Sequence, residues 1–255
     1  MVSKKMLDLG TKRSVIRDIF EYGSMLAKEI GAENVLDFSL GNPSTPAPRE
    51  VANTIKYMVE ELSPKEYNSY TSSAGNTDTR IAVAKNLNKR FATDYNENNI
   101  FMTCGAAASL NIIFKAIIES DDDEIIVNIP YFPEYKVFIE GQGGKPVFAK
   151  CSENLHLDID EIESKINENT KAVLINSPNN PSGVIYPKEN LEALATLLKQ
   201  KQKEYSHPIF LISDEPYREL VFTNEKPEFL PNIYDNTLVA YSWSKSLSLP
   251  GERIG

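Results

Sequence analysis

The sequence has few of the residues on which several common chemistries depend. Its 255 residues include only two histidines, His156 and His207, and two cysteines, Cys104 and Cys151. These residues form no cluster at ligand spacing, so neither a metal centre nor a histidine-activated nucleophile is indicated. Two cysteines in apolar segments are more typical of buried thiols in a reducing compartment than of a disulfide. Any catalysis must therefore use lysine, tyrosine and carboxylates.

Long apolar runs and an excess of positive charge are also missing. No run approaches the length of a membrane span, and the N-terminal residues lack the apolar region of a secretory signal. The net charge of -9 argues against nucleic acid or an anionic membrane as a partner. With 41% hydrophobic residues, the chain can bury a substantial core. We expect a cytoplasmic protein.

Short apolar segments alternate with helical ones along most of the chain. An amphipathic helix is predicted within the first thirty residues, a strand over 35–40 and a helix through Val51. Further strands are predicted over 100–104, 124–129, 146–150, 171–175, 209–213 and 238–242, with helices over 107–118, 158–166 and 188–202. Continuous apolar strands separated by helices indicate an α/β fold, a three-layer sandwich with a mostly parallel sheet. In such sheets ligands bind beyond the carboxyl ends of the strands.

Several predicted strands end in residues suited to a ligand. Gly105, Ala106 and Ala107 open a helix, where backbone amides and the helix dipole favour an anion, although small residues also serve tight packing. Tyr131 can stack on a planar ligand or simply pack. The asparagine-rich stretch 176–183 can form turns or donate to a ligand oxygen. Each signal has a structural explanation as well as a functional one.

An acid and a lysine complete this set. Asp214 closes an apolar strand and should hold its charge only beside a cation or a donor, unless it caps a helix. Lys245 follows another apolar strand, in the spacing Ser242-x-x-Lys245. That spacing also occurs in penicillin-recognising acyl-enzymes, but their Ser-Asp-Asn and Lys-Thr-Gly companions are absent. A buried lysine is suited to forming an imine with an aldehyde cofactor, with Arg253 holding an anionic group nearby.

Taken in order, these elements resemble the fold type I pyridoxal phosphate enzymes, specifically the class I/II aminotransferases of the aspartate aminotransferase type. The resemblance covers essentially the whole chain and rests on the following matches: Gly41-Asn42-Pro43; Tyr70 with Gly75 and Arg80; Gly105-Ala106-Ala107; the stretches 130–135 and 176–183; Ser213-Asp214-Glu215-Pro216-Tyr217; and Ser242-x-x-Lys245 with Pro250-Gly251-Glu252-Arg253.

The resemblance implies pyridoxal 5'-phosphate as cofactor and a role for each matching position. Lys245 would carry the internal aldimine and then act as base and acid. Asp214 would pair with the pyridine nitrogen, and Asn180 and Tyr217 would bond the ring phenolate oxygen. Tyr131 would stack on the ring. Transfer of an amino group from an L-amino acid to a 2-oxo acid by a ping-pong route is the implied activity.

The remaining implied contacts hold the phosphate and the substrate. Gly105, Ala106, Ala107, Ser242 and Arg253 would bind the phosphate. Tyr70 would reach the phosphate from a neighbouring subunit of a homodimer, and Gly41 and Asn42 would meet the substrate carboxylate.

The resemblance also implies how the chain is divided. Residues 1–48 would contribute to a small domain and 49–255 would form the large cofactor-binding domain. Because the family continues well past Arg253, we expect the chain to be a fragment lacking most of the small domain and the arginine that binds the substrate α-carboxylate.

Two other functions are compatible with the same constellation. A carbon–sulfur β-lyase, or a related elimination enzyme, uses the same cofactor and differs in where the charge of the carbanion is sent next. A non-catalytic regulator that binds the cofactor is also conceivable, although no basic helix-turn-helix segment precedes residue 35.

Overall fold

A computed structural model describes residues 2–11 and 15–255 of the chain. The chain divides into two compact units, with the boundary between Pro46 and Ala47, and each is described by itself. Within the described residues, no helix is both long and apolar enough to cross a membrane.

The first unit is helical. It contains α1 (Lys4–Thr11), α2 (Val15–Ile30) and the short helix η1 (Ala32–Asn34). The amphipathic helix predicted for the first thirty residues thus corresponds to two helices, and its residues 12–14 lie outside the described part. The strand predicted over 35–40 is wrong. Leu36 and Phe38 are exposed, and the backbone bonds recorded here are local ones, such as that from the Asn42 N–H to the Leu40 carbonyl, so no ladder forms.

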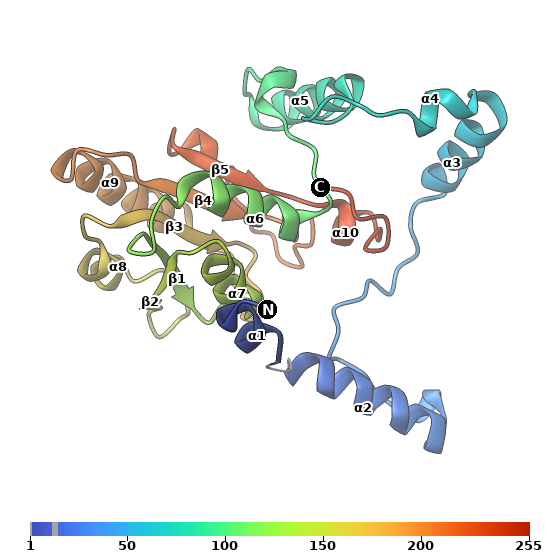
Figure 1. Ribbon diagram of the computed structural model, residues 1–255, viewed down its shortest axis with the longest axis horizontal. Coiled ribbons are helices and arrows are strands. Elements are labelled where there is room, and N and C mark those ends of the chain that lie inside the picture. Colours follow the sequence, from blue (N-terminus) through green and yellow to red (C-terminus); the bar gives the residue numbers. More distant parts are fainter. Residues whose placement is uncertain (1, 12–14) are drawn as a thin grey trace. The chain divides into compact units, whose positions relative to one another are not determined.

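The second unit is built around a five-stranded sheet with the order β2-β1-β3-β4-β5 (Figure 1). The strands are β1 (Glu124–Ile129), β2 (Lys145–Lys150), β3 (Thr170–Asn176), β4 (Phe210–Asp214) and β5 (Thr237–Ala240). Every neighbouring pair is parallel. The predicted α/β class and parallel sheet are therefore confirmed, with strand bounds within two residues of those expected.

The second unit also contains helices before, between and after the strands. They are α3 (Arg49–Glu61), α4 (Pro64–Asn68), α5 (Thr77–Phe91), η2 (Glu97–Asn99), α6 (Ala106–Ile117), α7 (Glu134–Gly141), α8 (Ile159–Lys165), α9 (Lys188–Glu204), η3 (Leu230–Asn232) and α10 (Trp243–Ser246). Residues of α8 and α9 pack with one face of the sheet, whereas residues of α6 and α7 pack with the other. This arrangement gives the expected three layers.

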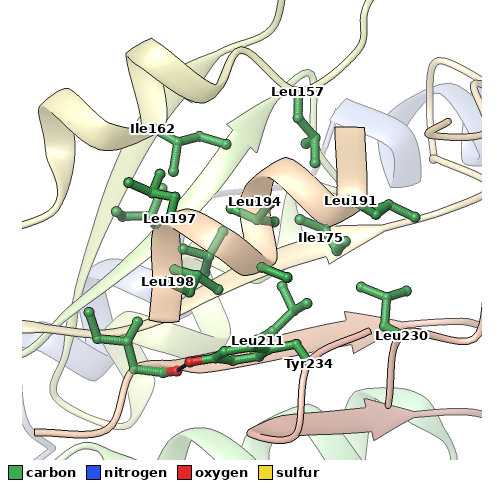
Figure 2. Packing of buried hydrophobic residues seen from close by; sticks show 14 of the residues in the cluster. Leu157, Ile162, Ile175, Leu191, Leu194, Leu197, Leu198, Leu211, Leu230 and Tyr234 are labelled. Carbon is green, nitrogen blue, oxygen red and sulfur yellow. Dashed lines mark hydrogen bonds between the residues drawn. The ribbon is translucent and has the colours of Figure 1, made fainter. Parts of the chain in front are cut away.

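Both faces of the sheet are apolar because both are covered. On β3, Val173 belongs to the cluster under α8 and α9, and the next residue, Leu174, belongs to the cluster under α6 and α7. Figure 2 shows the first cluster, in which Leu191, Leu194 and Leu198 of α9 lie with Ile175 and Leu211 of the sheet. A side-chain period of two with both faces buried produces the continuous apolar runs of the sequence.

The strand predicted over 100–104 is also wrong. This stretch has no regular assignment, although Thr103 and Gly255 exchange both backbone bonds, at 2.8 and 3.0 Å. Such an exchange is the antiparallel hydrogen-bonded pair. One pair of residues does not make a ladder, so the extended backbone at Thr103 is not classed as a strand.

The two cysteines only partly follow the expectation. Cys104 and Cys151 are both free thiols, but Cys104 is exposed and Cys151 is only partly buried, so neither is buried as expected. It lies where the chain passes from the extended stretch into α6, outside both apolar clusters.

The packing of α9 generates a stability prediction. Leu194 is fully buried at the centre of its cluster, so Leu194→Ala should lower the free energy of unfolding by about 2–5 kcal/mol through lost burial and a residual cavity. Lys199→Ala on the exposed side of the same helix is the control, with an expected change within roughly 0.5 kcal/mol. Urea unfolding followed by circular dichroism measures both, and equal effects would contradict this packing.

Candidate active site

The carboxyl ends of the parallel strands bring the candidate residues to one edge of the sheet. Asp214 is the last residue of β4 and pairs in register with Asn176, the last residue of β3. It also pairs with Ala240, the last residue of β5, which leads into α10 and Lys245. The topology, not the spacing in sequence, therefore gathers this set.

Asp214 is the most constrained group at this edge. Its side chain is 5% exposed, and its Oδ2 accepts a hydrogen bond of 2.5 Å from the Tyr135 hydroxyl of α7. Its Oδ1 is buried without any hydrogen-bond partner. Burial, opposed by the Tyr135 bond and reinforced by the Glu215 charge, raises the pKa of Asp214 to about 7. No helix begins directly after β4 in the described part of the chain, so Asp214 does not cap one. A buried acceptor left without a donor costs about 1–3 kcal/mol, so its Oδ1 is suited to a cationic N–H donor.

Asn176 ties the strand end to the loop that follows it. Its Nδ2 donates to the Asp214 carbonyl at 2.7 Å, and its Oδ1 accepts from the Asn180 backbone N–H at 2.6 Å. The Asn180 Nδ2 in turn donates to the Tyr217 hydroxyl at 3.3 Å. Burial, with the nearby Asp214 charge, raises the pKa of Tyr217. Asn180 and Tyr217, predicted to act on one ligand oxygen, are thus brought together.

A second buried acid lies directly behind Asp214. Glu215 is 2% exposed, accepts a bond of 2.6 Å from the Ser213 hydroxyl and pairs with Arg218. The Arg218 guanidinium lies over aromatic rings, namely those of Phe91, Phe229 and Tyr241, with ring centroids 5.0 to 5.2 Å away. Because Arg218 neutralises Glu215, two adjacent carboxyl groups can be buried at the same strand end.

The start of α6 forms a cradle for an anion. Gly105 precedes the helix with φ +96°, and a Cβ added to it would lie 2.8 Å from a guanidinium nitrogen of Arg253. Arg253 itself donates to the Pro250 carbonyl at 2.9 Å and the Cys104 carbonyl at 3.2 Å. The first amides of a helix have no partner within it. The amides of Ala106 and Ala107 and the Arg253 charge thus meet at a position that only glycine permits.

Lys245 and Ser242 lie on the segment that follows β5. Ser242 is buried immediately before α10, and Lys245 is half-buried in that helix. Burial lowers the pKa of Lys245. A lowered pKa increases the fraction of neutral amine near pH 7, which is the form that attacks a carbonyl.

The other residues predicted for the site are Tyr131, Tyr70, Gly41 and Asn42. The Tyr131 ring stacks on Phe148 of β2, with centroids 5.0 Å apart and planes at 24°, so Phe148 covers one of its faces. Tyr70, between α4 and α5, is fully exposed. Gly41 and Asn42 belong to the first unit, so their role toward a substrate stays a prediction.

Two residues at this edge escaped the sequence analysis. Tyr135 belongs to a matched motif but has no role predicted for it, and Asn176 counts only as part of a stretch predicted to form turns or donate to a ligand oxygen. Their signal was positional, since Asn176 ends a strand and Tyr135 lies in the first turn of the helix after another strand. Recognising them required the register that sets Asn176 opposite Asp214.

Together these groups are suited to a small planar ligand that carries a cationic group at one end and an anionic group at the other. One end would carry a cationic N–H group for Asp214, and the other an anionic group for the Gly105 and Arg253 cradle. Lys245 would supply an amine, and the pair of Asn180 and Tyr217 would offer donors to a ligand oxygen. The residues present fit a cofactor with a ring nitrogen, a phosphate and an aldehyde.

Comparisons with known proteins agree with this geometry. A family model described as aminotransferase class I and II matches residues 33–255. The probable aspartate/prephenate aminotransferase of Aquifex aeolicus is 32% identical over 237 residues. An amino transferase structure from Eubacterium rectale has 50% sequence identity and a TM-score of 0.96. The aspartate aminotransferase of Thermus thermophilus with maleate is 26% identical, with a TM-score of 0.85.

The chain is shorter than these relatives. Its match covers 90% of this chain and 57% of the Aquifex protein. The structural match covers 100% of this chain and 64% of the Eubacterium chain, or 63% of the Thermus chain. The chain thus spans about three fifths of the length of the proteins it resembles.

The burial of Asp214 generates a pH prediction. Its pKa is raised from 3.8 to about 7, so between these values the folded chain holds a proton that the unfolded chain has lost. The free energy of unfolding should therefore fall as the pH rises through this window. Asp214→Asn should remove this loss and stabilise the cofactor-free chain above pH 7, on the order of 2–4 kcal/mol, with little difference near pH 4.

Urea unfolding of the cofactor-free chain across this pH range measures the difference between the two proteins. Asp235→Asn, at an exposed aspartate, is the control and should follow the original chain at every pH. A difference between Asp214→Asn and the original chain that does not change with pH would sink the idea.

Proposed function

The chain belongs to the aminotransferase class I and II family, a family of pyridoxal phosphate-dependent transaminases, and we propose that it acts as one of them. The proposed reaction moves an amino group from an L-amino acid to a 2-oxo acid by a ping-pong route. The observation that carries the proposal is Asp214, buried at the end of β4 with one carboxylate oxygen bonded and the other without a donor.

When bound, pyridoxal phosphate supplies an electron sink for the carbanion formed at the substrate α-carbon. Asp214 would serve this chemistry by accepting the pyridinium N–H at Oδ1, since an ionised partner keeps that nitrogen protonated. Asn180 and Tyr217 would donate to the ring phenolate oxygen, and Tyr131 would stack on the ring. The half-buried position of Lys245 excludes bulk water from part of its surroundings.

Lys245 is the proposed attachment point and the proton carrier. Its neutral amine, favoured by the lowered pKa, holds the cofactor covalently through Nζ. With substrate bound, the same Nζ would take up the α-proton and return it at another carbon. One residue serves both purposes because the substrate takes over its covalent position.

The phosphate is proposed to lie at the N-terminus of α6. Its oxygens would accept from the amides of Ala106 and Ala107, with Gly105 giving room for the guanidinium of Arg253. The buried hydroxyl of Ser242 would complete this set from the end of β5. Tyr70 would contribute from the second subunit of a homodimer with shared active sites, and its full exposure supports this assignment.

The substrate assignments rest on the family. Residues 1–48 would contribute to a small domain, with Gly41 and Asn42 meeting the substrate carboxylate, and 49–255 would form the large domain. Relatives from Pyrococcus horikoshii and Bacillus subtilis are named aspartate aminotransferases, and the Thermus structure contains the dicarboxylate maleate. Aspartate is therefore the amino donor to test first.

The role of Lys245 gives a spectroscopic prediction. With pyridoxal phosphate, the purified protein should show an absorbance band near the visible edge that shifts when aspartate is added. Lys245→Ala should lose this band and at least about a thousandfold of any transaminase rate, while still binding phosphate at the α6 cradle. Absorbance spectra and formation of the oxo acid from aspartate measure the two effects.

Lys201→Ala is the matched control, since Lys201 lies on α9 and pairs with Glu163 and Glu204. It should keep both the band and the rate. A protein that stays colourless with pyridoxal phosphate would contradict the proposal. Release of ammonia and pyruvate from a sulfur-bearing amino acid such as cysteine, without any added oxo acid, would instead identify a carbon–sulfur β-lyase, because the thiol is the leaving group.

A further inference from the structure

Tyr135 connects α7 to the acid at the end of β4. The two residues are 79 positions apart in sequence, and the Tyr135 hydroxyl donates to Asp214 Oδ2 at 2.5 Å. Its side chain is 2% exposed and packs edge-on against Phe132, with ring centroids 5.5 Å apart. A hydrogen bond in such dry surroundings is stronger than the same bond in water.

This bond leaves Asp214 with a single available acceptor. Oδ2 is occupied by Tyr135, whereas Oδ1 is buried without a partner. A carboxylate with neither oxygen bonded can rotate and accept through either one, but the bond at Oδ2 leaves Oδ1 for an incoming donor. The direction of Oδ1 is therefore set by α7 rather than by the strand that carries Asp214.

The bond also favours the charged form of the carboxyl group. Burial and the adjacent Glu215 raise the pKa of Asp214, and the Tyr135 hydrogen bond lowers it. The other titratable groups facing this pair are Tyr217, which follows β4, and Tyr186, which follows β3. Of the tyrosines, Tyr135 alone has a recorded hydrogen bond to the Asp214 side chain within the described part of the chain.

We propose that Tyr135 is a positioning residue of the cofactor site, which presents Oδ1 of Asp214 to the ring N–H and holds the carboxyl group ionised. This inference rests on the proposed function, because the N–H donor is the pyridinium of pyridoxal phosphate. Tyr135 acts through Asp214 and does not itself touch the cofactor. A tyrosine that only filled the core would be replaced by phenylalanine without consequence for the charge of Asp214.

The test is a titration of the chain and its Tyr135→Phe variant with pyridoxal phosphate, followed by absorbance at several pH values. Affinity should fall on the acid side as Asp214 becomes protonated. Without the Tyr135 donor the carboxyl group protonates at higher pH, so this acid limb should move up by roughly one unit. The affinity near pH 7 should then drop about tenfold and recover as the pH rises.

Tyr234→Phe is the matched control. Tyr234 is equally buried, in the opposite cluster, and its hydroxyl donates to the Ile209 carbonyl at 2.6 Å (Figure 2). Its loss removes a buried hydroxyl without touching Asp214. The chain should become easier to unfold, while the acid limb of cofactor binding stays where it is.

Two further variants make the test decisive. In an Asp214→Asn background, Tyr135→Phe should cause no further change in affinity, because the group through which it acts has lost its charge. Tyr135→fluorotyrosine keeps the ring and gives a more acidic hydroxyl, so it should move the acid limb to lower pH even if Tyr135→Phe folds poorly.

Two results would overturn the role of Tyr135. One is an acid limb that stays in place in both Tyr135 variants, and the other is a Tyr135→Phe effect that persists without the Asp214 charge. A chain that binds no pyridoxal phosphate before any substitution contradicts the proposed function instead, so the two failures can be told apart.

Discussion

The buried carboxylate of Asp214 is the constraint on which the site depends. A charged group at 5% exposure with one unpartnered oxygen is unfavourable, and the folded core must offset its cost. The surrounding structure fixes it from three directions. Asn176 donates to the backbone carbonyl of Asp214, and Tyr135 donates to one oxygen of its side chain. Arg218 neutralises the neighbouring Glu215. What remains is one acceptor of defined direction.

The direction of the parallel strands is enough to bring the other residues of the site to Asp214. Because β3, β4 and β5 run the same way, their carboxyl ends deliver Asn176, Asp214 and the segment with Lys245 to one edge. Arg253, which follows α10, completes the cradle at Gly105, where its guanidinium donates to the Cys104 carbonyl. Gly105 adopts φ +96° without strain, whereas the unpartnered Oδ1 of Asp214 is unfavourable for folding alone, as is typical of functional sites.

Much of this could be predicted from sequence because it is local. The apolar run 124–129 matches β1 at both ends, and the polar residues after each strand identified Asp214 and Lys245. The partnership of Asp214 with Tyr135 could not be predicted, since it depends on how α7 packs against the sheet. The strand predicted over 100–104 failed because a strand is defined by its neighbour, and Thr103 pairs with one residue only. The strand predicted over 35–40 is wrong for a similar reason, because no neighbouring strand pairs with it in the described part of the chain.

The most direct measurement is the protonation state of the ring nitrogen in the bound cofactor. Pyridoxal phosphate labelled at its pyridine nitrogen can be bound to the chain and observed by nitrogen NMR at about pH 8, above the pKa of Asp214. A ring nitrogen held by ionised Asp214 should show the chemical shift of a protonated pyridinium, and Asp214→Asn should convert it to that of a neutral pyridine. A neutral nitrogen in the original chain, or a shift that ignores the substitution, would contradict it.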